Sequence, residues 1–276
     1  MTMYIPNIMK KIIFLKFCFF FFSLTAQEFI TIQSTTSIRD SGFYNYIQDK
    51  YQEESSTKLK VVAVGTGQAI ENAKKCDADL LFVHHEPSEI KFVKNGYGLY
   101  RKVIMHNDFI LVGPKNDPAG IKIKKNIKEA LKIIYNSKHS FVSRGDKSGT
   151  HLKEQELWAL VGIKIEKKKS DWYFESGSGM GSSLNLAVNI GAYILSDRST
   201  WISFGNKKNH TIIVENEPLL VNNYGIIPIN PKNCPTTKSL EAEKFIYWLK
   251  SKEGKSLINN FRVDGQQVFF SSQDVN

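Results

Sequence analysis

Cysteine is scarce in this chain of 276 residues, which has only three. Cys18 lies close to the N-terminus, and the rest of the chain holds Cys76 and Cys234. These two are far apart and match no metal-binding spacing, which argues against a structural zinc site. In an oxidising compartment they could form a disulfide. The sequence leaves that pairing open.

A membrane-spanning run is also missing. The most apolar stretch, Ile12–Phe22, is interrupted by Lys16 and is shorter than the ~20 residues that a transmembrane helix needs. Lys10-Lys11 precede it and Ser23-Leu24-Thr25-Ala26 follow it, which is the pattern of a secretory signal peptide. We therefore expect residues 1–26 to be a signal peptide that is removed from an exported protein. Lipid attachment at Cys18 stays open.

Motifs of several common enzyme classes are absent. No Gly-x-Ser-x-Gly nucleophile elbow occurs. Gly65-Thr66-Gly67 lacks the third glycine of a dinucleotide site, because Ile70 stands there, and residues 145–150 lack the Gly-Lys pair of a Walker motif. His84 and His85 are adjacent at the end of an expected strand and cannot easily share one metal ion. We expect a protein without catalytic residues, cofactor or direct metal ligands.

Acidic residues are outnumbered by basic ones, 27 to 37, which gives a net charge of +10. Residues 1–26 contain three lysines and no acids, so their removal lowers the charge to +7. A positive excess fits an acidic partner, such as nucleic acid, a membrane surface or small anions. The lysines are spread along the chain, and their one run, Lys167-Lys168-Lys169, is typical of a solvated loop. We therefore expect no nucleic-acid partner.

Short apolar segments alternate with helical patterns along the mature chain, which indicates an α/β protein with parallel strands. The expected strands are at 29–32, 59–64, 79–83, 108–113, 140–143 and 192–195, followed by an extended segment at 219–229. A mature chain of roughly 250 residues fits two lobes. We place lobe 1 at 27–109 with 226–276 and lobe 2 at 110–225, because the last helical pattern needs a sheet to pack on. Two crossing segments, near 107–113 and 220–227, would form the hinge.

One segment between an expected strand and an expected helix carries hydrogen-bond donors. It contains Arg144, Ser148, Gly149 and Thr150. Unpaired N–H groups at a helix start attract anions, the hydroxyls can donate, and a guanidinium offers a planar fork to oxyanion oxygens. The alternative for this segment is an ordinary surface turn.

A second group of donors follows the first two strands. Ser34-Thr35-Thr36-Ser37 follows one strand and Gly65-Thr66-Gly67 follows the next. Ligands of open α/β sheets bind at the carboxyl ends of strands, although Ser and Thr are also common helix caps. A site with hydrogen-bond donors and no carboxyl group suits a fully ionised oxyanion, because such an anion has no proton to donate. The two groups together predict an anion cleft between the lobes.

The chain resembles the tungstate-binding periplasmic proteins of the tungstate ABC importer, a branch of the type II periplasmic binding proteins. The resemblance runs in the same order through nearly the whole mature chain. Its main stretches are Ser34–Ser37 with Asp40-Ser41-Gly42, Val61–Ala69, Asp77–His84, Asn107–Pro114, Phe141–His151, Gly179–Gly181 with Leu184-Asn185, Tyr193–Trp201 and Asn223–Ile227. The chain departs from the family at Ser34, Ile38 and Arg39, where the family usually has Thr, Thr and Gln, and at His85, where an acidic residue is frequent.

The resemblance implies a two-lobe type II periplasmic binding protein fold that closes on one tungstate ion. The implied contacts are Thr35, Thr36, Ser37, Thr66, Arg144, Ser148 and Thr150. It further implies a monomeric periplasmic protein that delivers tungstate to the permease in the inner membrane.

Three alternatives stay open. Molybdate has nearly the same size and charge as tungstate, so the sequence does not rank the two. Phosphate binders of the same fold share the Arg-x-x-x-Ser-Gly-Thr pattern, and a protonated phosphate would favour a carboxylate acceptor such as Asp146 or Asp40. An adhesion or signalling module that retains only the fold is the third alternative, and it predicts no response to oxyanions.

Overall fold

The computed structural model describes residues 28–123, 126–165 and 170–273. The expected signal peptide and the run Lys167–Lys169 lie outside these residues. The strands are β1 (Phe29–Thr35), β2 (Lys58–Val64), β3 (Leu80–Val83), β4 (Lys102–Pro114), β5 (Phe141–Ser143), β6 (Tyr173–Glu175), β7 (Tyr193–Asp197), β8 (His210–Val214), β9 (Val221–Pro228), β10 (Arg262–Val263), β11 (Gln266–Gln267) and β12 (Phe270–Ser271). The helices are α1 (Thr36–Asp40), α2 (Phe43–Glu54), α3 (Thr66–Lys74), α4 (Glu86–Lys94), α5 (Ile127–Ser137), α6 (Gly149–Leu160), α7 (Met180–Ile190), α8 (Arg198–Ser203), the 3₁₀ turn η2 (Pro218–Leu220), α9 (Ser239–Lys250) and α10 (Lys252–Asn260).

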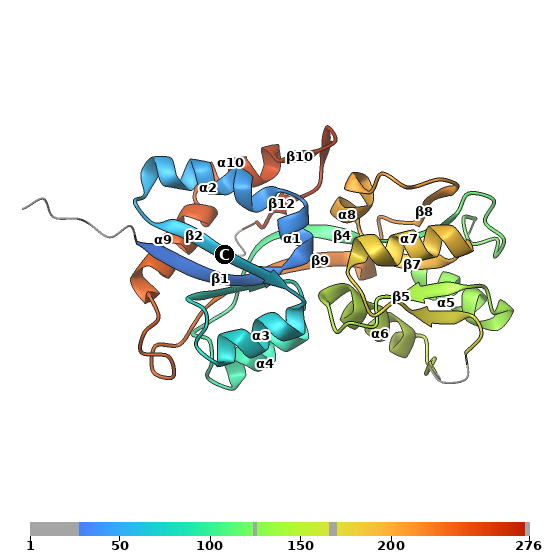
Figure 1. Ribbon diagram of the computed structural model, residues 1–276, viewed down its shortest axis with the longest axis horizontal. Coiled ribbons are helices and arrows are strands. Elements are labelled where there is room, and N and C mark those ends of the chain that lie inside the picture. The colour runs from blue at the N-terminus through green and yellow to red at the C-terminus, as the bar shows by residue number, and fades with distance from the viewer. Residues whose placement is uncertain (1–27, 124–125, 166–169, 274–276) are drawn as a thin grey trace, which may run out of the picture.

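Two α/β parts lie side by side, as Figure 1 shows. The part with β1 to α4 and α9 to β12 is called the first lobe here, and the part from α5 to β8 the second lobe. The strand order is β2-β1-β3-β9-β4-β7-β5-β6, so one path of hydrogen-bonded strands runs through both lobes. The architecture is α/β, with two lobes joined by one path of strands.

Each lobe has helices on both faces of its sheet. In the first lobe Ile30 and Phe82 pack with α2, α9 and α10, while Leu81 and Val83 on the other face pack with α3 and α4. In the second lobe β4 alternates in the same way, and its residues 109 and 111 face α5 and α6 while 110 and 112 face α7. Strands that are buried on both faces explain the nearly continuous apolar runs in the sequence.

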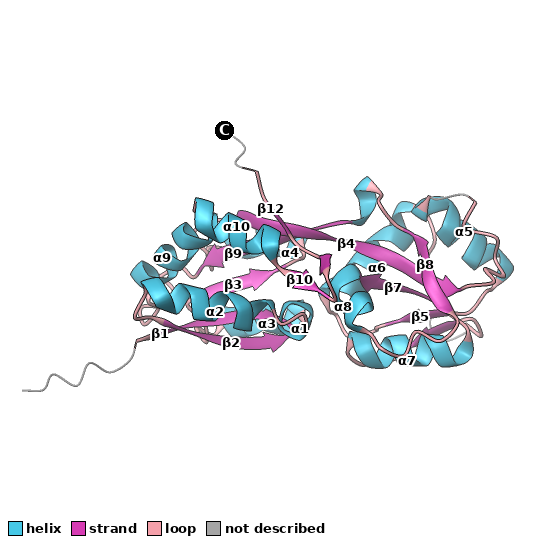
Figure 2. Ribbon diagram, turned by 90° about the horizontal axis from the view of Figure 1, so that it is seen from above, coloured by secondary structure: helices cyan, strands magenta, loops and turns pink. Residues whose placement is uncertain are grey.

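Two strands join the lobes. Figure 2 shows β4 passing as one long strand from the first lobe into the second. Its first half, from Lys102 to Asp108, pairs with β9, and its second half, from Phe109 to Pro114, pairs with β7 and β8. β9 in turn pairs with β3 of the first lobe. The crossing segments therefore lie in hydrogen-bonded strands near the middle of the sheet path.

The sheet is mixed, which differs from the parallel sheet expected from the sequence. Strands β1, β2 and β3 pair in parallel, as do β5, β6 and β7, but β4 and β9 pair antiparallel with their neighbours. A strand that crosses between lobes runs against the strands it joins, whereas a helical crossover returns the chain in the same direction. The sequence pattern also missed β6, β8, α10 and the short C-terminal strands.

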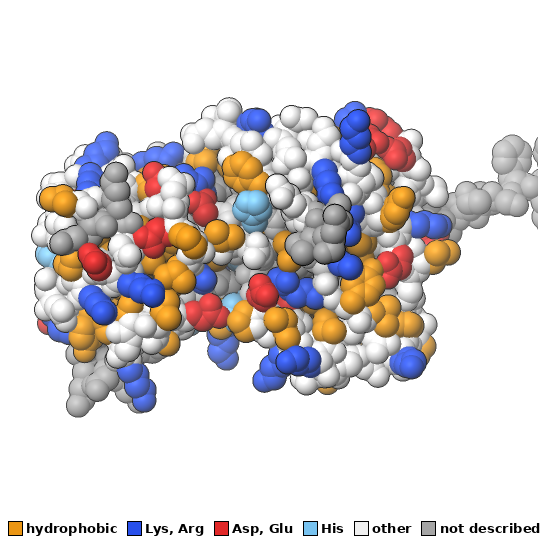
Figure 3. Space-filling model, turned by 180° about the vertical axis from the view of Figure 1, so that it is seen from behind, with side chains coloured by type: hydrophobic (Ala, Val, Ile, Leu, Met, Phe, Trp, Pro, Cys, Tyr) orange, Lys and Arg blue, Asp and Glu red, His pale blue; other side chains and the backbone are white. Residues whose placement is uncertain are grey.

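Positive and negative side chains are mixed on the surface. Figure 3 shows Lys and Arg side chains dispersed among acidic and apolar ones on the face seen from behind. Among the described residues no helix is long and apolar enough to cross a membrane. The positive excess is therefore not gathered into one strip on this face.

Cys76 and Cys234 form a disulfide, with a Cα–Cα distance of 5.3 Å across a sequence separation of 158 residues. The bond ties the loop after α3 to the segment between β9 and α9. Cys234 is buried among the residues that pack on α3 and α4. The disulfide therefore links the C-terminal segment of the first lobe to its N-terminal segment.

Replacing both cysteines with serine should destabilise the protein by about 2–4 kcal/mol, because the bond restricts a long loop in the unfolded chain. Urea unfolding, followed by circular dichroism under oxidising conditions, measures the difference. The reduced parent should unfold like the double variant, and the double variant should not respond to reductant. Equal midpoints for the oxidised parent and the double variant would contradict the stabilising role.

Candidate functional site

Donor residues of the first lobe lie at the ends of two paired strands. β1 and β2 are parallel and in register, with Thr35 opposite Val64, so both chains leave the sheet at the same edge. Thr35 is buried, and its Oγ1 lies 3.1 Å from Oγ of Ser37 in α1. Thr36 begins α1 and is half-buried, while Thr66 begins α3 and is fully buried. The structure thus brings the four expected residues of this lobe to one edge.

Donor residues of the second lobe lie in the turn between β5 and α6. The buried Arg144 follows β5, and its Nη2 donates to Oδ2 of Asp146 at 2.5 Å. Gly145 has a φ of +64°, and a Cβ there would lie 2.9 Å from Glu175, so the turn requires glycine. Ser148 caps α6 and Thr150 lies in its first turn, both buried. Arg144, Ser148 and Thr150 therefore share one turn.

The two groups of loops face each other across the lobes. A Cβ on Gly65 would lie 3.8 Å from Asp146 O and Ser148 Cα, and one on Gly67 would lie 3.5 Å from Lys147 O. A Cβ on Gly149 would lie only 2.5 Å from Cε1 of His84, closer than real contacts allow. The lobes therefore touch at these loops, and glycine permits the approach.

A hydrogen bond between side chains also joins the lobes at this edge. His85 follows β3 in the first lobe, and its Nε2 lies 2.9 Å from Oε1 of Glu156 on α6. The hydrogen bond from His85 lowers the pKa of the Glu156 carboxyl. Contacts between lobes thus extend beyond the glycine loops.

Two donors in the facing loops are buried without a partner. Thr66 Oγ1 and Arg144 Nε are both inaccessible, and neither has a hydrogen-bond partner within the described ranges. One comes from each lobe. Buried donors are normally paired, because leaving one unsatisfied costs about 1–3 kcal/mol. Their position in facing loops suits a ligand that accepts hydrogen bonds.

The carboxylates that could accept a ligand proton are already engaged. Asp146 accepts from Arg144 through Oδ2 and from the backbone N–H of Ser148 through Oδ1, at 3.0 Å. Asp40 lies on the surface and pairs with Arg39 at 2.7 Å. Near the cleft, Asp197 caps α8 and accepts from Ser199 Oγ and Thr200 Oγ1, each at 2.6 Å. The facing loops are therefore richer in free donors than in free acceptors.

Sequence reasoning considered His84 only as a metal ligand and did not place it in the anion site. The structure buries it beside the expected contacts, with Nε2 3.2 Å from Ser37 Oγ and Nδ1 3.0 Å from Asn222 Oδ1. Burial lowers the pKa of His84 to about 4. Its place at the end of β3, next to β1, was the available signal. Asn222 had none, since it appeared only as an interruption of an extended segment.

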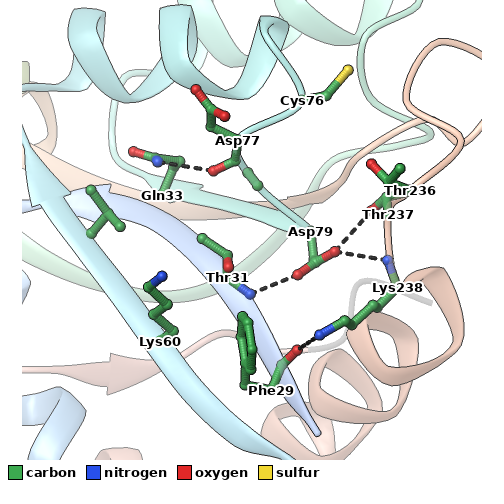
Figure 4. Close-up of a pocket in the computed structure, with 12 residues that line it drawn as sticks. Phe29, Thr31, Gln33, Lys60, Cys76, Asp77, Asp79, Thr236, Thr237 and Lys238 are labelled. Carbon is green, nitrogen blue, oxygen red and sulfur yellow. Dashed lines mark hydrogen bonds between the residues drawn. The ribbon is translucent and has the colours of Figure 1, made fainter.

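Another pocket, of about 370 Å³, lies at the opposite ends of β1 and β2 (Figure 4). Its acceptor Asp79 receives hydrogen bonds from the backbone N–H groups of Thr31 and Lys238, both at 2.7 Å. The carboxylate of Asp79 is thus satisfied by protein donors. In the part of the chain that the structure describes, no three metal-binding side chains cluster. The facing loops remain the best candidate site.

Comparison with known proteins agrees with this arrangement. The model of the PBP superfamily domain matches residues 25–253. The tungstate-binding protein TupA of Peptoclostridium acidaminophilum is 43% identical over 238 residues, which cover 86% of this chain and 82% of that protein.

Two solved structures are similar over the same length. The tungstate-binding protein TupA from Desulfovibrio alaskensis G20 has a TM-score of 0.79 and 34% identity, and the match covers 90% of this chain and all of that one. The structure of the tungstate ABC transporter from Geobacter sulfurreducens has a TM-score of 0.77 and 41% identity, covering 86% of this chain and all of that one. The chain therefore belongs to the PBP superfamily and, within it, to the family of the TupA tungstate-binding proteins, which are binding proteins and not enzymes.

Proposed function

We propose that this chain is the substrate-binding protein of an ABC importer and captures tungstate between its two lobes. The observation that carries the proposal is the pair of buried, unpartnered donors, Thr66 Oγ1 and Arg144 Nε, in loops that face each other. An oxyanion between the loops would accept from both. The names of the relatives support tungstate as that oxyanion.

The proposed contacts are the hydroxyls, backbone N–H groups and guanidinium of Thr35, Thr36, Ser37, Thr66, Arg144, Ser148 and Thr150. Tungstate is a dianion without a proton at neutral pH, so it needs donors alone. Phosphate is a weaker candidate because it keeps a proton, and the oxygens of Asp146 and Asp40 are engaged elsewhere. Molybdate matches tungstate in size and charge, and we propose it as a second ligand.

The lobes would close about the two crossing strands, β4 and β9, with lobe 1 formed by 27–109 and 226–276 and lobe 2 by 110–225. Each lobe supplies part of the donor set, so the anion favours the closed state over the open one. In this proposal the protein works as a monomer in the periplasm after removal of residues 1–26. It then presents the closed form to the membrane permease.

Thermal unfolding with tungstate, molybdate, sulfate and phosphate at equal concentrations tests the ligand class. A ligand at 100 times its dissociation constant stabilises the folded protein by about 2.7 kcal/mol, so tungstate should raise the unfolding midpoint clearly. Sulfate and phosphate should raise it much less. A shift with phosphate and none with tungstate would refute the proposal, and no shift with any anion would favour a module that retains only the fold.

Arg144→Ala should weaken tungstate binding by about 2–5 kcal/mol, the range for removing one partner of a buried charge pair. The change also leaves the Asp146 carboxylate unpaired beside a dianion. The double variant Arg144→Ala/Asp146→Asn should therefore bind more tightly than Arg144→Ala alone. Thr66→Val should cost about 1–3 kcal/mol, for one donor to a charged group.

Calorimetric titration with tungstate measures these affinities. Arg262→Ala, at an exposed arginine of β10 outside the facing loops, removes the same charge and should bind like the parent. If Arg144→Ala binds as tightly as Arg262→Ala, the turn after β5 is an ordinary surface turn.

Gly149→Ala should prevent full closure, because its Cβ would meet the His84 ring at 2.5 Å. Overpacking of this kind costs about 1–3 kcal/mol, so tungstate should bind at least several-fold more weakly. Gly67→Ala is the matched control, since its Cβ would meet Lys147 at an ordinary 3.5 Å. Small-angle scattering should show tungstate reducing the radius of gyration of the parent and the control, and less so that of Gly149→Ala. Equal reductions in all three would count against closure at these loops.

A further inference from the structure

His84 holds together three parts of the cleft. Its Nε2 lies 3.2 Å from Ser37 Oγ, its Nδ1 lies 3.0 Å from Asn222 Oδ1 on the crossing strand β9, and its ring lies 4.8 Å from that of Tyr224. Gly149 of the second lobe covers the ring edge at Cε1, between the two nitrogens. The imidazole is buried and both of its nitrogens are engaged.

The hydrogen bonds around Asn222 define which nitrogen carries the proton. Asn222 Nδ2 donates to Asn107 Oδ1 at 2.7 Å, so Asn222 Oδ1 is the atom that faces His84. A carboxamide oxygen only accepts, and Nδ1 must therefore donate. In a neutral imidazole the other nitrogen then has no hydrogen. His84 Nε2 is an acceptor, and the hydroxyl of Ser37 donates to it.

This arrangement turns hydroxyl protons away from the cleft. The single proton of Ser37 points to His84, so the contact of 3.1 Å between Ser37 Oγ and Thr35 Oγ1 has Thr35 as its donor. The chain of donation runs from Thr35 to Ser37 to His84. Two of the proposed oxyanion contacts are therefore committed to protein acceptors while His84 is neutral.

A proton on Nε2 reverses the chain. His84 would then donate to Ser37 Oγ, and Ser37 would be free to donate to Thr35 or to the anion. Whichever hydroxyl ends the chain then offers its proton to the ligand. The proton comes from the solvent and remains on the imidazole, and no covalent bond other than the new N–H forms.

We propose, on the basis of the proposed function, that His84 is a positioning residue that takes up one proton when the oxyanion binds and so frees a hydroxyl of the Thr35–Ser37 pair to donate to the ligand. Binding and proton uptake are then two parts of one event. The dianion supplies the charge that makes the imidazolium stable in a buried place.

The charges around His84 fit a proton that arrives only with the ligand. Burial is the main cause that lowers its pKa to about 4; Arg144 and His85 act in the same direction, and Asp197 acts against them. The ring is therefore neutral in the ligand-free protein at ordinary pH. A dianion in the cleft raises the pKa, since opposite charge favours the imidazolium. Between the free and bound pKa values, affinity rises as pH falls, by up to about tenfold per pH unit.

Calorimetry of tungstate binding to the parent, in buffers with different ionisation enthalpies near pH ~6, counts the protons taken up. We expect about one proton per anion at that pH, and fewer as the pH rises above the bound pKa of His84. Absence of proton uptake with normal binding would overturn the proposal. Absence of binding itself would instead count against the proposed function.

Variants then identify the proton site. His84→Gln places an amide N–H near the position of Nε2, so it should donate to Ser37 permanently, bind tungstate without proton uptake, and show an affinity independent of pH. His106→Gln removes a half-buried histidine of β4 that lies outside the facing loops, and this variant should keep the proton uptake. His85→Gln tests the contact with Glu156 between the lobes and should also keep it.

Proton uptake that persists in His84→Gln would overturn the assignment to His84. Loss of the uptake in His85→Gln, with tungstate binding retained, would assign the proton to His85 instead. If His84→Gln does not fold, as judged by circular dichroism, the proton count and pH dependence of the parent, His85→Gln and His106→Gln still decide the question.

Discussion

Buried hydrogen-bond donors that lack a protein acceptor are the constraint on which the architecture of the cleft depends. Thr66 Oγ1 and Arg144 Nε are such donors within the described residues, and they lie in loops that meet across the lobes. Folding leaves them unsatisfied at a cost that an accepting ligand can offset. Closing the lobes on an anion would therefore stabilise both loops at once.

The glycines and the crossing strands allow the loops of the two lobes to come into contact. β4 and β9 carry the chain between the lobes inside one hydrogen-bonded sheet path, so the loop edges of the two lobes stay aligned. Position 149 is glycine, and a Cβ there would clash with the His84 ring. Because glycine has no Cβ, its backbone N–H group can approach a ligand closely.

In the proposed function the loops would bind a fully ionised anion, and the charges around them fit this. Arg144 is partly neutralised by Asp146, and the same carboxylate orders the turn by accepting from Ser148. Asp197 is occupied by the start of α8. Both carboxylates already accept hydrogen bonds from protein donors, whereas Thr66 Oγ1 and Arg144 Nε are donors without a partner among the described residues. His84 is the titratable group that lies between these charges and the hydroxyls of the first lobe.

The sequence by itself determined the alternation of apolar strands and helices and the two groups of donors, which include Thr66 and Arg144. It could do so because periodicity and turn chemistry are local properties. It did not determine the antiparallel direction of β4 and β9 or the pairing of Cys76 with Cys234, which depend on how distant segments return to one another. Only the tertiary structure decided that Gly149 meets His84 and that Asn222 orients its ring. These contacts join residues 65 and 138 positions apart, and no local pattern records a distance between residues so remote along the chain.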